Sequence, residues 1–432
     1  MVRCDAGAVS EQEAGAGLAG AGRAGAGRAE AAGEALGRRW REARAPSGVV
    51  HLDAAGAARP SLATVEAQAA FLRAESERGA YVAELAEEDA LRAGREALAG
   101  LLGPGLDPAD VVWHHGASAA FGALLGAWPL RVGGRVGVVP SEYGSNRLVL
   151  EACAARASLE LVDLPVDPSG TVDLDRLDAD GIDRFDLVVF PQVPSQRGIT
   201  QPAAEIGRRC AAAGVPLVVD VAQSLGQVDT TGIGAAAYVG TSRKWLCGPR
   251  GAGFVALRAG VADRLGVALP SLYSARRVAD GPPVPLPGAA RLAVGEASVA
   301  ARVGLARALA AYVAEEPAAV RMRIAALGAH GREVLDGAGG WRVGEPAEAV
   351  GGIITLRPPA GVDPVAARDA LYREAGILTS AIPVARARDL RDPLLRASAH
   401  AYNDPTDLDR LAAALDRLPV SGAGHRCGSN TP

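Results

Sequence analysis

Short apolar segments alternate with longer stretches of helical periodicity from about residue 48 onward. The short segments predict β-strands over 111–115, 135–140, 159–164, 186–191, 215–221, 236–240 and 251–257. The stretches around them predict helices over 60–78, 83–101, 118–129, 145–157 and 202–213. This alternation is typical of an α/β fold, in which a mostly parallel sheet carries helices on both faces. In such a sheet, ligands bind beyond the carboxyl ends of the strands.

The pattern changes after a proline-rich connection at 282–287, where a long helix is predicted over 295–316 and mixed strand and helix patterns continue to about 418. With 432 residues the chain is too long for one core. We therefore predict a large domain over 48–290 and a smaller α+β domain over 291–420.

The two ends of the chain differ from the rest in composition. Residues 1–47 are rich in Ala and Gly, with Arg and Glu interspersed. We interpret them as a flexible tail with a frayed helix near 29–43, which activity does not need. Residues 421–432 are interpreted as a second flexible tail.

Composition and charge exclude several classes of protein. The formal net charge of -4 provides no basic field for nucleic acid. No apolar run is long enough to cross a membrane, and the charged first residues do not form a secretion signal. The five cysteines lack metal-ligand spacing and fit a reducing, cytoplasmic setting; they are Cys4, Cys153, Cys210, Cys247 and Cys427.

Lysine usage is the most informative feature of the composition. Lys and Arg total 45, and Lys244 is the only lysine among them. Lysine can lose its proton and attack a carbonyl, whereas guanidinium stays charged. Asp220 ends the strand at 215–221, and Lys244 follows the next strand, so both side chains should meet at one edge of the sheet. A lysine that attacks an aldehyde and an aspartate that protonates a pyridine are the protein groups that pyridoxal phosphate needs. The alternative is an Asp220 that caps a turn and a Lys244 in a solvated loop.

A phosphate-binding element is predicted beside this pair. Ala117 and Ser118 follow Gly116 and open the helix after the first strand, where backbone N–H groups can approach an anion. Thr241 and Arg243 can add a hydroxyl and a fixed positive charge from the lysine loop. A simple helix cap is the alternative for the small residues.

The segments DVAQ at 220–223 and GTSRKWLCGPRG at 240–251 resemble the cofactor signature of class V aminotransferase-like enzymes. The resemblance extends from about residue 51 to about 418. It implies the fold-type I architecture of pyridoxal phosphate enzymes and a homodimer. It further implies that Lys244 binds the cofactor covalently, Asp220 contacts the pyridine nitrogen and Gln223 donates to the phenolic oxygen. Ser118, Thr241 and Arg243 would hold the phosphate. Tyr143, in the motif SEYGSN, stands where the family usually has a stacking histidine.

Substrate contacts follow from the same resemblance. Arg396, in the segment RAS followed by YN, is similar to the arginine that binds the substrate α-carboxylate. A surface arginine is the alternative. Two departures separate the chain from the cysteine desulfurases of this family. Residues 379–388 lack the cysteine that takes up sulfur, and Glu296 replaces a threonine that reaches the partner subunit's phosphate. Glu296 would suit a cationic substrate; the alternative is that it caps the following helix.

These motifs together resemble the hercynylcysteine sulfoxide lyase branch of the family. That branch implies a carbon–sulfur β-lyase acting in ergothioneine biosynthesis, with pyruvate and ammonia as products. The alternatives are a desulfurase or selenocysteine lyase-like activity, transamination of another amino acid, and a cofactor-binding protein without turnover.

Overall fold

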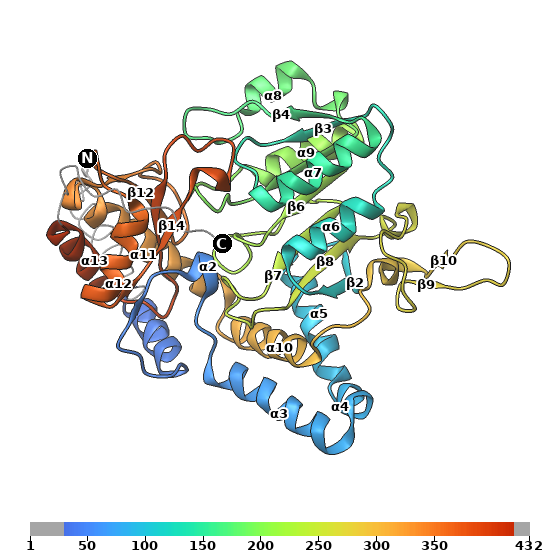
Figure 1. Cartoon of the computed structure of the whole chain (residues 1–432), viewed down its shortest axis with the longest axis horizontal. Coiled ribbons are helices and arrows are strands. Elements are labelled where there is room, and N and C mark those ends of the chain that lie inside the picture. Colours follow the sequence, from blue (N-terminus) through green and yellow to red (C-terminus); the bar gives the residue numbers. More distant parts are fainter. Residues whose placement is uncertain (1–29, 419–432) are drawn as a thin grey trace, which may run out of the picture.

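The computed structural model describes residues 30–418, and its centre is a seven-stranded sheet with the order β2-β8-β7-β6-β5-β3-β4 (Figure 1). Strands β3 to β7 run parallel to one another, whereas β8 pairs antiparallel with both β7 and β2. All of the predicted strands are present, as β2 (Leu106–His114), β3 (Arg135–Val138), β4 (Glu160–Asp163), β5 (Leu187–Pro191), β6 (Leu217–Asp220), β7 (Ala237–Thr241) and β8 (Gly253–Arg258). The predicted α/β fold class is therefore confirmed.

Side chains of the central strands alternate between two buried layers. In β5, Leu187 and Val189 pack on one face, and Val188 and Phe190 pack on the other. Both faces are covered by helices, so these strands are apolar at every position. Helices α6 (Ala117–Ala127) and α7 (Gly144–Ala157) cover the first face. The second face is covered by α5 (Glu88–Leu102), α8 (Leu174–Asp180), α9 (Ala203–Ala213) and α10 (Val299–Ala314).

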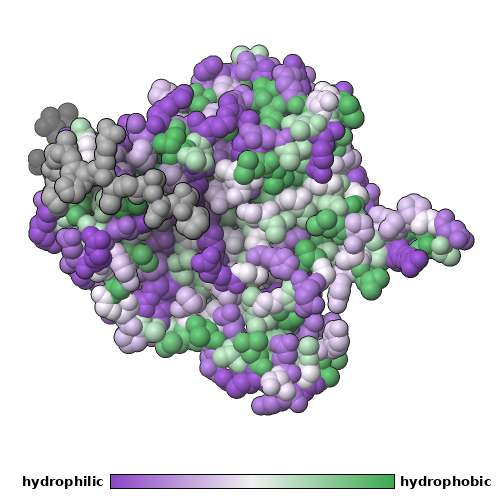
Figure 2. Space-filling view, in the orientation of Figure 1, coloured by the Kyte–Doolittle hydropathy of each residue, from purple (hydrophilic) through white to green (hydrophobic). Residues whose placement is uncertain are grey.

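A helical layer lies outside α10. Helix α3 (Leu62–Arg78) packs against α10 and is followed by the short α4 (Ala80–Ala86), so the helix predicted over 83–101 is interrupted at Glu87. The hairpin of β9 (Ala275–Arg276) and β10 (Val284–Pro285) projects from the body of the protein (Figure 1). The space-filling view shows the same arm standing clear of the surface (Figure 2).

The smaller part of the structure is built on a four-stranded antiparallel sheet. Its strands are β11 (Arg342–Val343), β12 (Ile353–Arg357), β15 (Leu394–Ser398) and β14 (Ser380–Ile382), in that order. Its helices are α11 (Pro317–Leu335), α12 (Pro364–Ala375) and α13 (Pro405–Arg417). Beside them, β1 (Val50–His51) pairs in parallel with β13 (Ile377–Leu378), and the short helix α2 (Ala54–Ala57) follows β1. Within residues 30–418, no helix is both long and apolar enough to span a membrane.

The predicted domain boundaries need correction at both ends. Leu305 and Leu309 of α10 are buried in the core of the large sheet, so the boundary at 290/291 separates α10 from the layer that it completes. Val50 and Leu52 belong instead to the core of the small sheet. A hydrophobic pattern gives the presence of a helix but not the layer against which it packs.

The helix predicted near 29–43 is present, but the flexible tail predicted over 1–47 is wrong for residues 30–47. Residues 30–42 form a helix, and Leu36 and Trp40 on it are buried against the rest of the fold. These two apolar side chains lie four residues apart on one face, within a segment that otherwise resembles low-complexity sequence. Residues 1–29 and 419–432 lie outside the described part of the chain, so the tails expected there stay predictions.

Candidate active site

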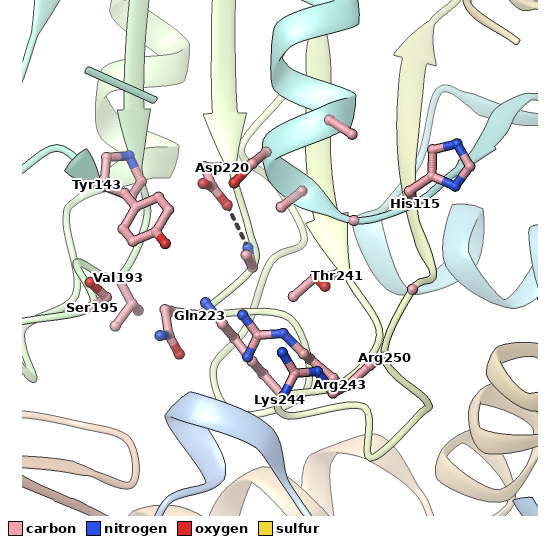
Figure 3. A pocket seen from close by; sticks show the side chains of 17 residues that line it. His115, Tyr143, Val193, Ser195, Asp220, Gln223, Thr241, Arg243, Lys244 and Arg250 are labelled. Carbon is pink, nitrogen blue, oxygen red and sulfur yellow. Dashed lines mark hydrogen bonds between the residues drawn. The ribbon is translucent and has the colours of Figure 1, made fainter. Parts of the chain in front are cut away.

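A cavity of about 300 Å³ lies beyond the carboxyl ends of β5, β6 and β7, next to the start of α6 (Figure 3). This is the edge of the sheet that sequence analysis selects. The cavity brings together most of the predicted site residues: Ala117, Ser118, Tyr143, Asp220, Gln223, Thr241, Arg243 and Lys244. Arg396 and Glu296 are not among its lining residues.

Asp220 ends β6 and points into the cavity with only 5% of its surface exposed. The Ala222 backbone N–H donates to Oδ1 at 2.7 Å, and the Asn146 amide donates to Oδ2 at 2.8 Å. Burial raises the pKa of Asp220, while the positive charge of Lys244 and the two hydrogen bonds oppose that shift. A fixed carboxylate with an open side toward the cavity can accept a hydrogen bond from a protonated ring nitrogen.

Lys244 lies in the loop between β7 and β8. The loop is held by hydrogen bonds from Cys247 N to Lys244 O at 3.0 Å and from Gly248 N to Ser242 O at 2.9 Å. Burial lowers the pKa of Lys244 to about 7; Asp220 opposes this shift, and neighbouring arginines add to it. An amine with this pKa is substantially neutral near pH 7, so it can act as a nucleophile or as a base.

The start of α6 forms the anion-binding end of the cavity. The N-cap is Gly116, and no side chain caps the first turn, so its N–H groups remain available to a ligand. Thr241 and Arg243 line the same end, together with Arg250, which sequence analysis did not select. Gly253 of β8 permits this approach, because a Cβ at that position would lie 2.6 Å from the Gly116 Cα.

Gln223 and Tyr143 flank the part of the cavity between Asp220 and the anion-binding end at α6. The Gln223 amide donates to the Ala55 carbonyl at 3.0 Å, and its oxygen accepts from the Trp245 indole at 2.8 Å. One amide hydrogen is therefore left for a ligand. The Tyr143 ring lies 5.9 Å from the Lys244 Nζ, measured to the ring centroid. This position is compatible with the predicted stacking role.

Arg396 lies beside the cavity on β15 and is 3% exposed. Its Nη1 donates to the Ser195 carbonyl at 2.9 Å, and its Nη2 donates to the Asp53 carboxylate at 3.0 Å. Ser195 itself lines the cavity, and Arg396 lowers the pKa of Lys244, so the guanidinium acts at the site electrostatically. Its predicted contact with a substrate carboxylate stays a prediction.

Glu296 is not brought to this cavity. It is exposed at a separate cavity of about 850 Å³, which is also lined by Trp113 and Tyr273. The predicted substrate role of Glu296 would concern a neighbouring subunit's site, and it stays a prediction.

Two buried polar residues behind Asp220, Glu142 and Asn146, were not predicted from the sequence. Glu142 accepts from the Tyr143 backbone N–H at 2.8 Å and from the Asn146 amide at 3.1 Å. Burial and the nearby charge of Asp220 raise the pKa of Glu142 to about 8. Both residues stand in the motif SEYGSN, where the spacing of four residues was the available signal.

The chain was compared with known proteins and structures. Residues 50–411 match the family model described as aminotransferase class-V. The chain is 41% identical over 399 residues to a probable hercynylcysteine sulfoxide lyase from Mycobacterium tuberculosis, covering 91% of this chain and 96% of that protein. It is 30% identical over 340 residues to an isopenicillin N epimerase from Streptomyces clavuligerus, covering 75% of this chain and 83% of that protein.

Two solved structures have the same fold. The cysteine desulfurase CsdA from Escherichia coli superposes with a TM-score of 0.80 at 21% identity, covering 88% of this chain and 98% of that one. The cystine C–S lyase C-DES, solved with its product cysteine persulfide, gives a TM-score of 0.77 at 19% identity, covering 86% of this chain and 98% of that one. Another structure of C-DES contains glycine covalently linked to the cofactor pyridoxal phosphate.

Proposed function

Because this chain belongs to the class-V aminotransferase family, we propose that it is a pyridoxal phosphate-dependent carbon–sulfur lyase that cleaves hercynylcysteine sulfoxide. The observation that carries the proposal is the 41% identity, along nearly the whole chain, to a probable hercynylcysteine sulfoxide lyase. The lack of cysteine in residues 379–388 supports it, because a desulfurase of the usual type needs a thiol there.

Pyridoxal phosphate is the cofactor, and the residues of the cavity fit it. The uncapped first turn of α6, with Thr241 and Arg243, would hold the phosphate, and Asp220 would face the pyridine nitrogen. Lys244 supplies the amine that attaches the cofactor covalently. When bound, the cofactor withdraws electrons from the substrate α-carbon.

The protein's own groups carry the proton and hold the substrate. Once the substrate amine has taken its place, the released, neutral Lys244 amine would remove the α-proton, which its lowered pKa permits near pH 7. Arg396 orients the α-carboxylate. The bond from the β-carbon to sulfur then breaks, and its electron pair leaves with the sulfur. The remaining three-carbon fragment hydrolyses to pyruvate and ammonia, while the imidazole-bearing fragment keeps the sulfur.

Pyruvate release by the purified holoenzyme tests this function. Hercynylcysteine sulfoxide should yield pyruvate in a Lys244-dependent reaction, with cysteine and cystine as parallel substrates. Sulfide and alanine from cysteine would establish a desulfurase instead, and turnover that depends on an added keto acid would establish transamination. Light scattering on the same preparation tests the predicted homodimer.

A further inference from the structure

The loop between β14 and β15, residues 383–393, overlaps the segment 379–388 that lacks the cysteine expected of a desulfurase. We refer to it as the arginine loop. Its inner side has a small core of its own, which is closed by neighbouring residues of the two strands. The members of that core are Ile382, Ala387, Leu390 and Leu394. Burial of these side chains fixes the conformation of the loop.

Ionic contacts hold the arginine loop against the large sheet. The Arg388 guanidinium donates to the Asp163 carboxylate, with Nη1 3.0 Å from Oδ1. Asp389 accepts from Gln196 at 3.2 Å and forms a salt bridge with Arg197. The Asp389 side chain is only 10% exposed, so this anchor is largely shielded from solvent. The loop therefore occupies one position beside the cavity.

The fixed loop places Arg386 beside the active site. Its guanidinium carbon lies 5.9 Å from the centroid of the Tyr143 ring, the same ring that faces Lys244. Its charge lowers the pKa of Lys244, Arg243 and Arg396. Gly144 permits the close approach of the Arg386 backbone, because a Cβ at Gly144 would lie 2.8 Å from the Arg386 carbonyl oxygen. Arg386 thus adds positive charge to a site that already contains several cations.

The Arg386 guanidinium differs from that of Arg396 in having no hydrogen-bond acceptor within residues 30–418, a condition shared by Arg243 and Arg250 at the phosphate end of the cavity. Arg396 is held by Asp53 and by the Ser195 carbonyl, and Arg243 lines the phosphate end. Among residues 30–418, no carboxylate or carbonyl accepts a hydrogen bond from the half-buried Arg386 guanidinium. Unpaired, this cation repels the neighbouring arginines, so the arrangement becomes favourable when an anion binds.

We propose that Arg386 binds a second carboxylate of the substrate, located on the sulfur side of the bond that breaks. This inference rests on the proposed function, because hercynylcysteine sulfoxide carries one carboxylate on its cysteine part and another on its betaine part. With Arg396 at the first, the guanidinium of Arg386 matches the second in charge and in its planar, paired donors. The Tyr143 ring beside it is an aromatic surface for the adjacent trimethylammonium group.

Two substrates and three variants test this proposal. The first substrate is hercynylcysteine sulfoxide, and the second is the analogue that lacks only the betaine carboxylate. Arg386→Gln should raise KM for the first about 10- to 100-fold, and leave KM for the second within about twofold. Arg386→Lys should have a KM for the first substrate between those of the wild type and Arg386→Gln, because lysine keeps the charge and loses the paired donors. Arg391→Gln, which changes an exposed arginine of the same loop and leaves the Arg388 and Asp389 anchors in place, is the matched control.

Hercynine is the betaine part of the substrate without the cysteine part. Its binding, measured by calorimetry, provides a readout that does not require turnover. It should weaken in Arg386→Gln and persist in Arg391→Gln. An equal rise of KM for both substrates would assign Arg386 to the sulfoxide oxygen or to general charge and overturn the proposal, as would an unchanged KM for the first substrate. If the wild type cleaves neither substrate, the proposed function fails, and the hercynine titration still decides whether Arg386 binds this carboxylate.

Discussion

Replacing Trp40 with alanine should weaken cofactor binding, although Trp40 lies on the helix of residues 30–42 outside the cavity. The Trp40 ring stacks on His400 with centroids 5.0 Å apart. His400 Nδ1 accepts from the Ala401 N–H, so Nε2 carries the hydrogen and donates to the Trp245 carbonyl at 3.0 Å. Burial lowers the pKa of His400 to about 3, which keeps the ring neutral at pH 7. Trp245 directly follows Lys244, so the stack holds the lysine loop.

The structure gives two different magnitudes for this substitution. Trp40 is 7% exposed, and truncation of such a residue costs about 3–5 kcal/mol of unfolding free energy. The Arg44 guanidinium, 4.7 Å from the Trp40 ring, also loses that contact. His400 contacts the lysine loop through its hydrogen bond to the Trp245 carbonyl, through Cys247 Sγ at 3.3 Å from Nε2 and through stacking on the Trp245 ring. Truncation of Trp40 leaves these contacts in place but loosens the ring that makes them, and we expect a loss equivalent to about one hydrogen bond, about 1 kcal/mol. Cofactor affinity should therefore fall about fivefold, much less than the stability does.

Denaturant unfolding and cofactor titration measure the two effects separately. Trp40→Phe keeps an aromatic ring and should lose less stability and less cofactor affinity than Trp40→Ala. Arg38→Ala changes an exposed residue of the same helix and should alter neither the stability nor the cofactor affinity. An unfolding midpoint of Trp40→Ala equal to that of the wild type would refute the packing of this helix. A large loss of stability with unchanged cofactor affinity would refute the connection through His400.

Three further predictions concern the buried charges of the site. Lys244→Ala should keep the fold, seen by circular dichroism, and lose both the covalent cofactor, seen in its absorption spectrum, and pyruvate production; retained turnover would contradict the mechanism. Burial raises the pKa of Glu142 from its ordinary value of 4.5 to about 8, so the native state holds an extra proton between these pH values and stability falls as pH rises through them. In Glu142→Gln this pH dependence of the unfolding midpoint should flatten, and an unchanged slope would mean that Glu142 is ionised in the native state. Arg396→Ala should raise KM by an amount equivalent to about 2–5 kcal/mol through loss of the carboxylate contact, and an unchanged KM would remove Arg396 from the substrate site.

The strands and the edge of the sheet that carries the site were predictable because their signals are local. Each central strand is a continuous apolar run, and Asp220 is the polar residue that ends one of them. Lys244 follows the next strand, so the rule for parallel sheets was sufficient to bring the pair together. The helix start at Ala117 was found by the same reasoning. Their meeting in one cavity required no knowledge of side-chain packing.

Tertiary packing decided the features that sequence analysis misjudged. The helix of residues 30–42 is stabilised by Trp40 and Leu36, whose partners come from distant parts of the chain, such as His400. Its Ala-rich composition gives the same local pattern as a tail. Likewise, Arg386 is one of many arginines in the sequence. It is distinguished only by the anchoring of its loop through Arg388 and Asp389, which contact residues far away in the chain.

The motif SEYGSN shows where local reasoning ends within a single segment. The Asn146 amide donates to Glu142 Oε1 at 3.1 Å and to Asp220 Oδ2 at 2.8 Å, so one amide bridges two buried carboxyl groups. Two full negative charges on carboxylates that share one amide donor would repel strongly in a buried environment. Burial raises the pKa of both carboxyl groups, but the nearby charge of Lys244 opposes the shift at Asp220, whereas the pKa of Glu142 rises to about 8, so Glu142 holds the proton. The spacing of Glu142 and Asn146 was visible in the sequence, but their role was not, because Asp220 lies 74 residues from Asn146 along the chain.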